Sequence, residues 1–318
     1  MNTTIRFHQY GAPSVLQVED DAIGGAPGAG QVRLRHEAIG VNFIDTLFRQ
    51  GSFPVPLPAV PGVEGVGIVE ALGAGVAGIS VGQRMAYYLA PGSYTQQRLI
   101  NADLLVPVPD DLSAEQVAAV LTKGLTAWAG LNGYHQIQAG QTVLVQGASS
   151  GVGNLLARWA HARGAVVIGT AGSPDKRAAL ASAIDHVLPS DAPDLVVQLK
   201  RLAPQGVDVA YEFVGKATFA ATLAAVRDGG TIVSIGSASG APEFDKGEPA
   251  RRRIRMVGGP MAGHLQGRVG EATAAVFEAY RRGLFGAVQV TRYALEDAAK
   301  AHADIAERRK AGSLILIP

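Results

Sequence analysis

The chain has 318 residues, 47% of them hydrophobic and 17% charged, and its formal net charge is +1. This size and composition predict a compact protein of one large or two smaller domains, and the small charge gives no strong signal for nucleic acid binding. The sequence contains no cysteine, which excludes disulfides, thiolate zinc sites and cysteine nucleophiles.

The start of the chain, residues 1–6, lacks the apolar core of a signal peptide. The longest weakly polar stretch, residues 60–81, contains Glu64, Glu70 and several glycines. It is typical of strands and turns rather than of a membrane span. We therefore expect a cytoplasmic protein that does not cross a membrane.

The first 110 residues are rich in β signals. Residues 31–36 alternate apolar and polar side chains with period two, which is typical of a half-buried strand. Further short strands are expected at 66–70, 84–88 and 94–100, separated by glycine and proline, with one short helix at 44–50. These signals predict a mainly-β first domain.

After residue 112 the pattern changes to alternating strands and helices. Ser113-Ala-Glu-Gln116 matches a capping box that begins a helix, and Ser173-Pro174 is a favourable start for another. Apolar strands are expected at 142–146, 165–170, 207–211 and 231–235, and a further helix near 217–226. This alternation predicts an α/β fold, a doubly wound parallel sheet with helices on both faces.

The end of the chain predicts two amphipathic helices and a strand. Val269, Val276 and Phe277 mark the first helix, residues 295–309 form the second, and the strand covers 313–317. This strand has no neighbouring strand in the sequence with which to pair. It could return to the first domain, which would make that domain discontinuous.

The strongest motif is Val145-Gln-Gly-Ala-Ser-Ser-Gly-Val-Gly153, which follows a predicted strand and opens a helix. Small residues let the backbone approach a pyrophosphate, and the helix N-terminus supplies unpaired N–H groups and the positive end of a dipole. A tight strand–helix turn without a ligand is the alternative, and the flanking alternation disfavours it.

The glycine spacing also fits the short-chain dehydrogenases, which transfer a proton with a Tyr that has a Lys four residues later. At that spacing, Gln138 follows Tyr134 and Gly215 follows Tyr211. None of the eight tyrosines has the required Lys, and the motif lies in the middle of the chain. The short-chain interpretation is therefore disfavoured.

The end of the second strand indicates which dinucleotide binds. NAD enzymes usually place an acid there to hold the ribose hydroxyls. Here the strand runs into Gly169-Thr-Ala-Gly-Ser173 without an acid, and Lys176 and Arg177 follow in the first turn of a helix. A 2′-phosphate would be attracted by these cations, so we expect NADPH, unless both side chains simply face water.

Two segments are distinctive, Asn42-Phe-Ile-Asp45 and Lys123-Gly-Leu-Thr126. Together with 148–153, 233–240 and the ending 312–318, they resemble the zinc-free quinone oxidoreductase (zeta-crystallin-like) family of the medium-chain dehydrogenase/reductase superfamily. The similarity extends along the whole chain. It implies a GroES-like catalytic domain of residues 1–122 and 263–318, a Rossmann NADPH-binding domain of residues 123–262, a cleft between them and commonly a homodimer.

The resemblance also implies roles for individual residues. Asn42, Asp45 and Lys123 would be catalytic and, with Thr126, would face the nicotinamide half of the cofactor. The other implied cofactor contacts are Ala148, Ser150, Gly151 and Val152 in the glycine-rich turn, Ser173 and Lys176 at the 2′-phosphate, Val214, Ile235 and Ser237 along the walls, and Arg308 from the tail. Phe43, Leu47 and Phe53 would line the substrate pocket.

This chain departs from zinc-dependent relatives, which carry a Cys near position 42 and a Gly-His-Glu motif. Here the positions read Asn42 and Gly62-Val-Glu64. Because one carboxylate does not make a zinc site, we expect no metal and interpret Glu64 as a buried structural acid.

The chain also departs from the quinone oxidoreductases, which often have Tyr where it has Leu47, Phe53 and Ser190. A missing Tyr at 190 weakens the 2′-phosphate pocket. Leu47 and Phe53 make the substrate entrance more apolar, which leaves the preferred acceptor open.

The sequence therefore predicts an NADPH-dependent reductase that transfers a hydride to a quinone without a metal. Two alternatives stay open. The same step could reduce an activated C=C bond, as in an enone or a haloacrylate, with a donor such as Asn42 or Lys123 near the carbonyl. A non-enzymatic NADPH-binding protein of the crystallin type would also keep the glycine-rich turn.

Overall fold

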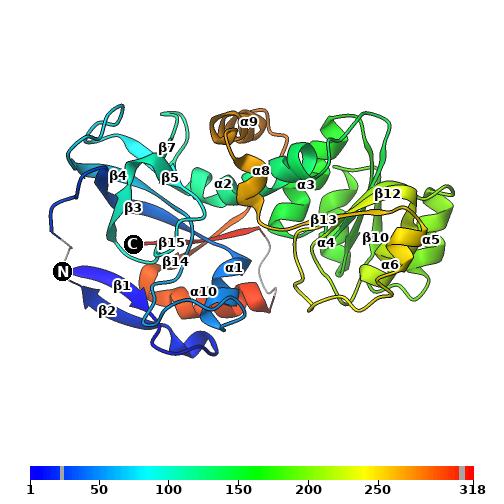
Figure 1. Ribbon diagram of the computed structural model, residues 1–318, viewed down its shortest axis with the longest axis horizontal. Helices are drawn as coiled ribbons and strands as arrows, with labels where there is room; N and C mark the ends of the chain where they lie inside the picture. The colour runs from blue at the N-terminus through cyan, green and yellow to red at the C-terminus, as the bar shows by residue number, and fades with distance from the viewer. Residues whose placement is uncertain (22–24, 308–311) are drawn as a thin grey trace. The chain divides into compact units, whose positions relative to one another are not determined.

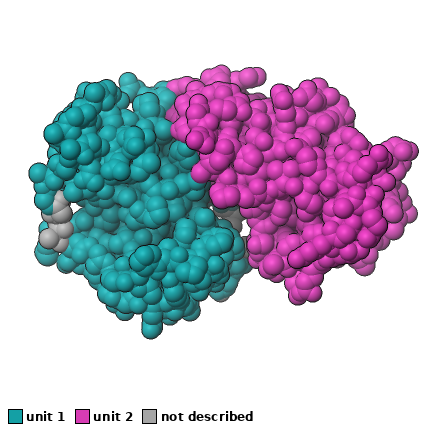
Figure 2. Space-filling model, in the orientation of Figure 1, with its two compact units in different colours: residues 1–122, 288–318 teal, residues 123–287 magenta. Residues whose placement is uncertain are grey.

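The computed structural model describes residues 1–21, 25–307 and 312–318. The chain forms two compact units, residues 1–122 with 288–318 and residues 123–287, which Figure 2 colours separately. No helix in the described part of the chain is both long and apolar enough to span a bilayer.

The first unit is built on a seven-stranded sheet in the order β14-β15-β3-β4-β5-β7, with β6 also paired to β3. Its strands are β3 (Gln31–Val41), β4 (Gly65–Leu72), β5 (Arg84–Tyr87), β6 (Gln97–Asn101), β7 (Val106–Pro107), β14 (Val290–Ala294) and β15 (Ser313–Ile317). A separate antiparallel pair consists of β1 (Asn2–Arg6) and β2 (Gln17–Asp21). The first unit is therefore mainly β, as the sequence predicts.

The last strand returns to the first unit. β15 pairs antiparallel with β3, with Leu314 opposite Val41 and Leu316 opposite Ile39. Ile39, Val41, Leu314 and Leu316 are buried in one hydrophobic cluster. Because this pairing buries apolar side chains of both strands, it favours the return of residues 313–317 to a strand from the start of the chain (Figure 1).

Helices and short 3₁₀ turns complete the first unit. They are α1 (Phe43–Arg49), α10 (Ala298–Ala306) and 3₁₀ turns at Pro13–Val15, Ala102–Leu104 and Leu295–Asp297. The predicted helix at 295–309 is thus shorter in the described residues and begins with a 3₁₀ turn. α2 (Ala114–Ala129) crosses the division between the units. Its capping box is confirmed, because Gln116 N donates to Ser113 Oγ and Ser113 N donates to the Gln116 side chain.

The second unit contains a six-stranded sheet in the order β10-β9-β8-β11-β12-β13, and every pair in it is parallel. The strands are β8 (Thr142–Gln146), β9 (Val166–Ala171), β10 (His186–Pro189), β11 (Val207–Glu212), β12 (Val226–Ser234) and β13 (Arg255–Gly258). Counted along the chain, this is the order 3-2-1-4-5-6 of a dinucleotide-binding Rossmann sheet.

Helices wind between these strands (Figure 1). They are α3 (Gly151–Ala162), α4 (Pro174–Ala181), α5 (Leu195–Leu202), α6 (Phe219–Ala225) and α7 (Glu248–Arg251). α5 and α6 bury Leu195, Leu199 and Phe219 against the sheet, and α3 packs on β8 and β9. The doubly wound α/β fold expected from the sequence is confirmed.

Residues 263–287 cluster with the second unit, whereas the sequence-based division assigns them to the first. They include most of α8 (Met261–Leu265) and all of α9 (Val269–Arg281). Val276 of α9 packs against Gly124, where an added Cβ would lie 2.6 Å from Val276 Cγ1. The Phe285 ring contacts the Trp159 ring of α3 with centroids 5.6 Å apart. These apolar contacts hold the segment against the Rossmann fold.

Candidate functional site

The glycine-rich turn lies between the end of β8 and the start of α3. Ser150 caps α3, since its Oγ accepts a hydrogen bond from Gly153 N at 3.1 Å. The Ala148 N–H donates to Thr170 O at 2.9 Å, which ties the turn to β9. The turn therefore presents a capped helix N-terminus at the carboxyl edge of the parallel sheet, where α/β folds bind dinucleotides.

Three glycines leave no room for side chains in this turn. Gly147 has a φ of +73°, which favours glycine. A Cβ on Gly153 would lie 2.4 Å from Gly147 O, and one on Gly151 would lie 3.0 Å from Lys123 Cδ. The glycines thus let the backbone fold tightly on itself at the start of α3, in a turn here named the glycine cradle, and such turns let a pyrophosphate approach the backbone N–H groups.

The end of β9 carries no acid, and the following residues form a polar N-terminus of α4. Ser173 caps this helix by accepting a hydrogen bond from Lys176 N at 3.3 Å. Arg177 donates through Nη1 to Gly172 O at 3.1 Å. A Cβ on Gly172 would lie 3.6 Å from Ser190 Oγ, so Ser190 borders the same corner. Two partly buried cations and two hydroxyls therefore surround this end of the strand.

A loop after β11 approaches the glycine-rich turn. Val214 Cγ2 would lie 3.0 Å from a Cβ on Gly147, and Gly215 lies against Ser237. The Ile235 N–H donates to Glu212 O at 3.1 Å. The predicted wall residues Val214, Ile235 and Ser237 thus belong to one cluster of loops in the second unit.

The carboxylate of Glu212 organises this cluster and was not predicted from the sequence. It is fully buried and accepts hydrogen bonds from the backbone of Val214 and Gly215 and from the hydroxyls of Thr218 and Thr222. The signal in the sequence that could have found it is a Glu at the end of strand β11, directly after the apolar residues 209–211.

The Asn42 amide is engaged within the first unit. Nδ2 donates to Glu64 Oε2 at 2.8 Å and to Gly40 O at 3.4 Å. Glu64 is fully buried, and its Oε1 accepts from Thr122 N at 2.9 Å. The sequence analysis interprets Glu64 as a structural acid. The carboxylate of Glu64 also links Asn42 to Thr122, the residue before Lys123.

Asp45 belongs to a buried hydrogen-bonded group. Its Oδ2 accepts from Asn42 N at 2.8 Å and from the Tyr94 hydroxyl at 3.1 Å. The Tyr94 oxygen lies 2.9 Å from His302 Nε2. Burial raises the pKa of Tyr94 and lowers the pKa of His302 to about 3, so both side chains are neutral at pH 7. Tyr94 and His302 come from distant parts of the chain, and sequence reasoning missed both.

Lys123 lies in the second unit beside the glycine-rich turn. Its side chain is 7% exposed, and Nζ has no hydrogen-bond partner among the described residues. Thr126, one turn later on α2, donates to Met261 Sδ at 3.1 Å. A buried ammonium is stable only with compensating partners, which is consistent with an anionic or carbonyl ligand at this position.

The predicted substrate residues lie together in the first unit. Phe43 and Leu47 are on α1, and Phe53 follows it, with its N–H donating to Leu47 O at 3.2 Å and its ring 6.0 Å from the Phe48 ring. Arg308, predicted to reach the cofactor from the tail, lies outside the described residues.

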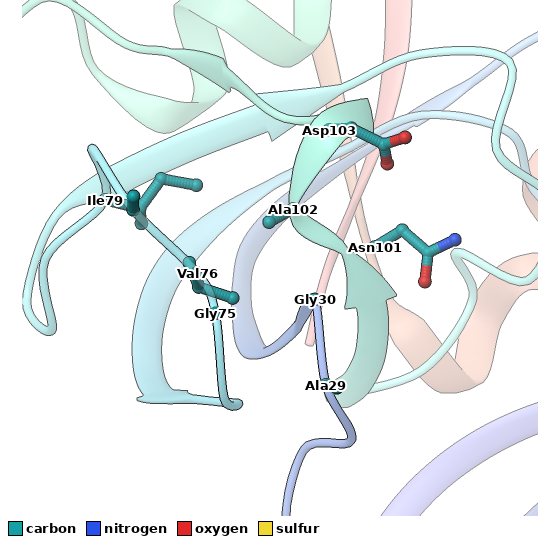
Figure 3. A pocket seen from close by; sticks show the side chains of 9 residues that line it. Ala29, Gly30, Gly75, Val76, Ile79, Asn101, Ala102 and Asp103 are labelled. Carbon is teal, nitrogen blue, oxygen red and sulfur yellow. The ribbon is translucent and has the colours of Figure 1, made fainter.

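The predicted site residues form no metal cluster in the described residues and lie apart from the hollow shown in Figure 3. Across 1–21, 25–307 and 312–318, no three His, Asp or Glu side chains gather in a way that could hold a metal ion. An open hollow of about 620 Å³ in the first unit is lined by loop residues around Gly30, Val76 and Asp103 (Figure 3). No predicted site residue lines it.

Comparisons with known proteins agree with this geometry. Residues 28–110 match the alcohol dehydrogenase GroES-like domain and residues 151–277 match the zinc-binding dehydrogenase domain. The chain is 35% identical to the quinone oxidoreductase of Pseudomonas aeruginosa, covering 100% of both chains. It is 34% identical to the 2-haloacrylate reductase of a Burkholderia species, covering 98% of both.

A solved structure of Escherichia coli quinone oxidoreductase complexed with NADPH superposes with a TM-score of 0.94 at 34% identity, covering 99% of this chain and 100% of that one. The second domain family is named for zinc, whereas this sequence has no Cys and has Val63 before Glu64. Full-length similarity and the shared two-domain organisation lead to one conclusion: this chain belongs to the quinone oxidoreductase family of medium-chain dehydrogenase/reductase enzymes.

Proposed function

We propose that the protein reduces quinones with NADPH and without a metal. The observation that carries the proposal is the glycine cradle at the start of α3, together with a strand β9 that ends without an acid. The first turn of α4 then supplies Lys176 and Arg177 beside one carboxylate, Asp175. The relative crystallised with NADPH and the quinone oxidoreductase of P. aeruginosa support the choice of cofactor and of acceptor.

NADPH, when bound, would supply the hydride, and the residues of the chain would bind and orient it. Backbone N–H groups near Ser150, Gly151 and Val152 would hold the pyrophosphate at the N-terminus of α3. Ser173 and Lys176 would hold the 2′-phosphate. Val214 would be kept against the cofactor by the buried Glu212 carboxylate, which fixes the backbone of its loop.

The contacts of Asn42 help to separate quinone reduction from reduction of an activated C=C bond. Reducing a C=C bond requires a donor at the substrate carbonyl, and both amide hydrogens of Asn42 are engaged by Glu64 and Gly40. Lys123 is the remaining predicted donor, because its buried ammonium has no hydrogen-bond partner among the described residues. A quinone needs no such donor, since its reduced oxygens can take protons from water.

Reduction of activated C=C bonds is the second candidate function. The 2-haloacrylate reductase relative supports it, because this relative is 34% identical to the chain, nearly the same as the quinone oxidoreductase of P. aeruginosa at 35%. Reduction of activated C=C bonds would depend on Lys123. Lys123→Met should then lower enone or haloacrylate turnover by a much larger factor than quinone turnover, when both are measured at saturating NADPH.

The deciding experiment measures NADPH oxidation with a panel of quinones, enones and 2-haloacrylates. We expect turnover of quinones, with slower or no turnover of the alkenes. Turnover of alkenes alone would favour the second function, and NADPH binding without any turnover would favour a non-enzymatic, crystallin-like role.

We also propose that the protein is a cytoplasmic homodimer. β13 lies at the edge of the six-stranded sheet, and its Met256 is 40% exposed. An unprotected edge strand can pair with a second copy of the chain. Met256→Lys should shift the protein toward monomers in sedimentation velocity, and an unchanged mass would contradict this interface. Cell fractionation would check the location.

A further inference from the structure

The loop that follows α1, residues 51–58, is here named the acceptor loop. It reads Gly51-Ser-Phe-Pro-Val-Pro-Leu-Pro58, and Phe53 is 49% exposed. Backbone hydrogen bonds hold its ends. The Phe53 N–H donates to Leu47 O at 3.2 Å, and the Ala59 N–H donates to Phe7 O at 3.0 Å. Between these contacts the loop lies at the surface and needs some other restraint.

The middle of the acceptor loop has few hydrogen-bond donors of its own. Residues 54, 56 and 58 are prolines, which have no N–H. Among the described residues, every hydrogen bond formed by residues 54–58 involves Tyr10. Its hydroxyl donates to Val55 O at 2.6 Å and accepts from Val55 N at 2.9 Å. One side chain therefore satisfies both backbone groups of Val55.

Tyr10 is 38% exposed, and one part of its ring packs against neighbouring residues. It lies 6.3 Å, centroid to centroid, from the fully buried Phe7 ring. On its other side it lies against Gly51, where a Cβ would meet Tyr10 Cγ at 2.9 Å and where the φ is +81°. Gly51 is therefore required both by its backbone conformation and by the close approach of this ring. A ring held in this way gives the hydroxyl a defined position.

We infer that Tyr10 is a positioning residue that sets which acceptors the enzyme takes, by holding the acceptor loop and its Phe53 in place. The inference depends on the proposed function and on the sequence-based prediction that Phe53 lines the substrate pocket. Tyr10 touches neither acceptor nor cofactor in this account. An acceptor large enough to reach Phe53 should sense the position of the loop, and a small one should not.

The test compares wild type with Tyr10→Phe, which keeps the ring packing and removes only the hydroxyl. The acceptors are 1,4-benzoquinone and the larger, apolar 9,10-phenanthrenequinone. Because the variant loses two hydrogen bonds, we expect KM for phenanthrenequinone to rise by up to about tenfold. The KM for benzoquinone, the KM for NADPH and kcat should change by less than about twofold, within the scatter of neutral substitutions.

Two further variants make the result specific. Tyr280→Phe removes a hydroxyl from α9 in the other unit and should leave all constants unchanged. Phe53→Ala should raise KM for phenanthrenequinone like Tyr10→Phe, and the double variant should be less than additive because both act through one loop. Hydrogen exchange at the Val55 amide, measured without any acceptor, should be faster in Tyr10→Phe.

If the KM for each quinone were the same in Tyr10→Phe as in wild type, and Val55 exchange were unchanged, the inference would be overturned. The proposed function would still stand. An equal loss with both quinones, together with a lower melting temperature, would show a purely structural role and also overturn it. If wild type reduced neither quinone, the proposed function would fail and the acceptor role of Tyr10 would fail with it.

Discussion

Replacing Gly153 by alanine is expected to weaken NADPH binding by roughly 10- to 100-fold while the protein stays folded. The new Cβ would lie 2.4 Å from Gly147 O, a backbone atom. To reach an ordinary contact distance, the turn would have to move by about 1 Å. A hydrogen bond lengthened that far is lost, and one bond to a charged group contributes roughly 1.5–3 kcal/mol.

The effect on folding should be smaller than the effect on binding. Overpacking costs about 1–3 kcal/mol, and alanine regains about 1 kcal/mol of helix propensity at a position inside α3. The net loss is therefore about 0–2 kcal/mol, which a protein of ordinary stability tolerates. NADPH affinity is measured by fluorescence titration and stability by urea unfolding.

A matched control separates the cradle from a general effect of adding a methyl group to a helix. Gly270 lies in α9, and a Cβ there would meet nothing within 4 Å. Gly270→Ala should leave the NADPH dissociation constant unchanged and slightly raise stability. If Gly153→Ala also left the affinity unchanged, the turn would not hold the pyrophosphate and the argument from the glycine cradle would be refuted.

The remaining predictions concern cofactor choice, metal dependence and pH. Lys176→Ala should raise KM for NADPH by about tenfold, because one charge-assisted hydrogen bond is lost, and should leave KM for NADH nearly unchanged. An equal rise for both cofactors would show that Lys176 is only a solvated helix residue. Activity should survive exhaustive chelation, and a loss that zinc restores would contradict metal independence. Burial lowers the pKa of His36 from 6.5 to about 4 and that of His302 to about 3. Below pH 6.5 the unfolded chain therefore binds more protons than the folded protein. Because of this difference, the free energy of unfolding should fall by on the order of 2 kcal/mol per histidine as the pH falls from 6.5 to 5, and it should stay level above pH 7. Urea unfolding at pH 5 and 7.5 checks this, and a free energy that rose toward pH 5 would have the wrong sign.

Periodicity and turn chemistry predicted much of the fold. The predicted strands at 142–146 and 313–317 coincide with β8 and β15, and Ser173 caps α4 as expected. These elements carry local signals, an apolar run or a capping hydroxyl, that do not depend on the rest of the chain. The short strands β10 and β13 were not predicted, because their half-exposed residues show neither a long apolar run nor a clear period.

Long-range contacts were the part that the sequence could not supply. The hydrogen bond from Tyr94 to Asp45 and its contact with His302 join residues from three distant segments. Likewise, α9 belongs with the Rossmann unit because of packing at Gly124, which no local pattern reveals. The family resemblance named candidate residues such as Asn42, yet only the coordinates show that its amide hydrogens are engaged by Glu64 and Gly40.

The position of β15 has a consequence for the order in which the protein matures on the ribosome. The second unit is one continuous segment, residues 123–287, whereas the sheet of the first unit has β15 between β14 and β3. During synthesis, the nucleotide-binding unit can therefore fold while the nascent first unit still has the edge of β3 uncovered. That edge carries Ile39 and Val41, which are fully buried in the folded protein, and stays open to mispairing until β15 has emerged from the ribosome. Ribosome-bound chains that end before residue 313 and continue into an unstructured linker long enough to fill the exit tunnel should display a protease-resistant second unit attached to a protease-sensitive first one.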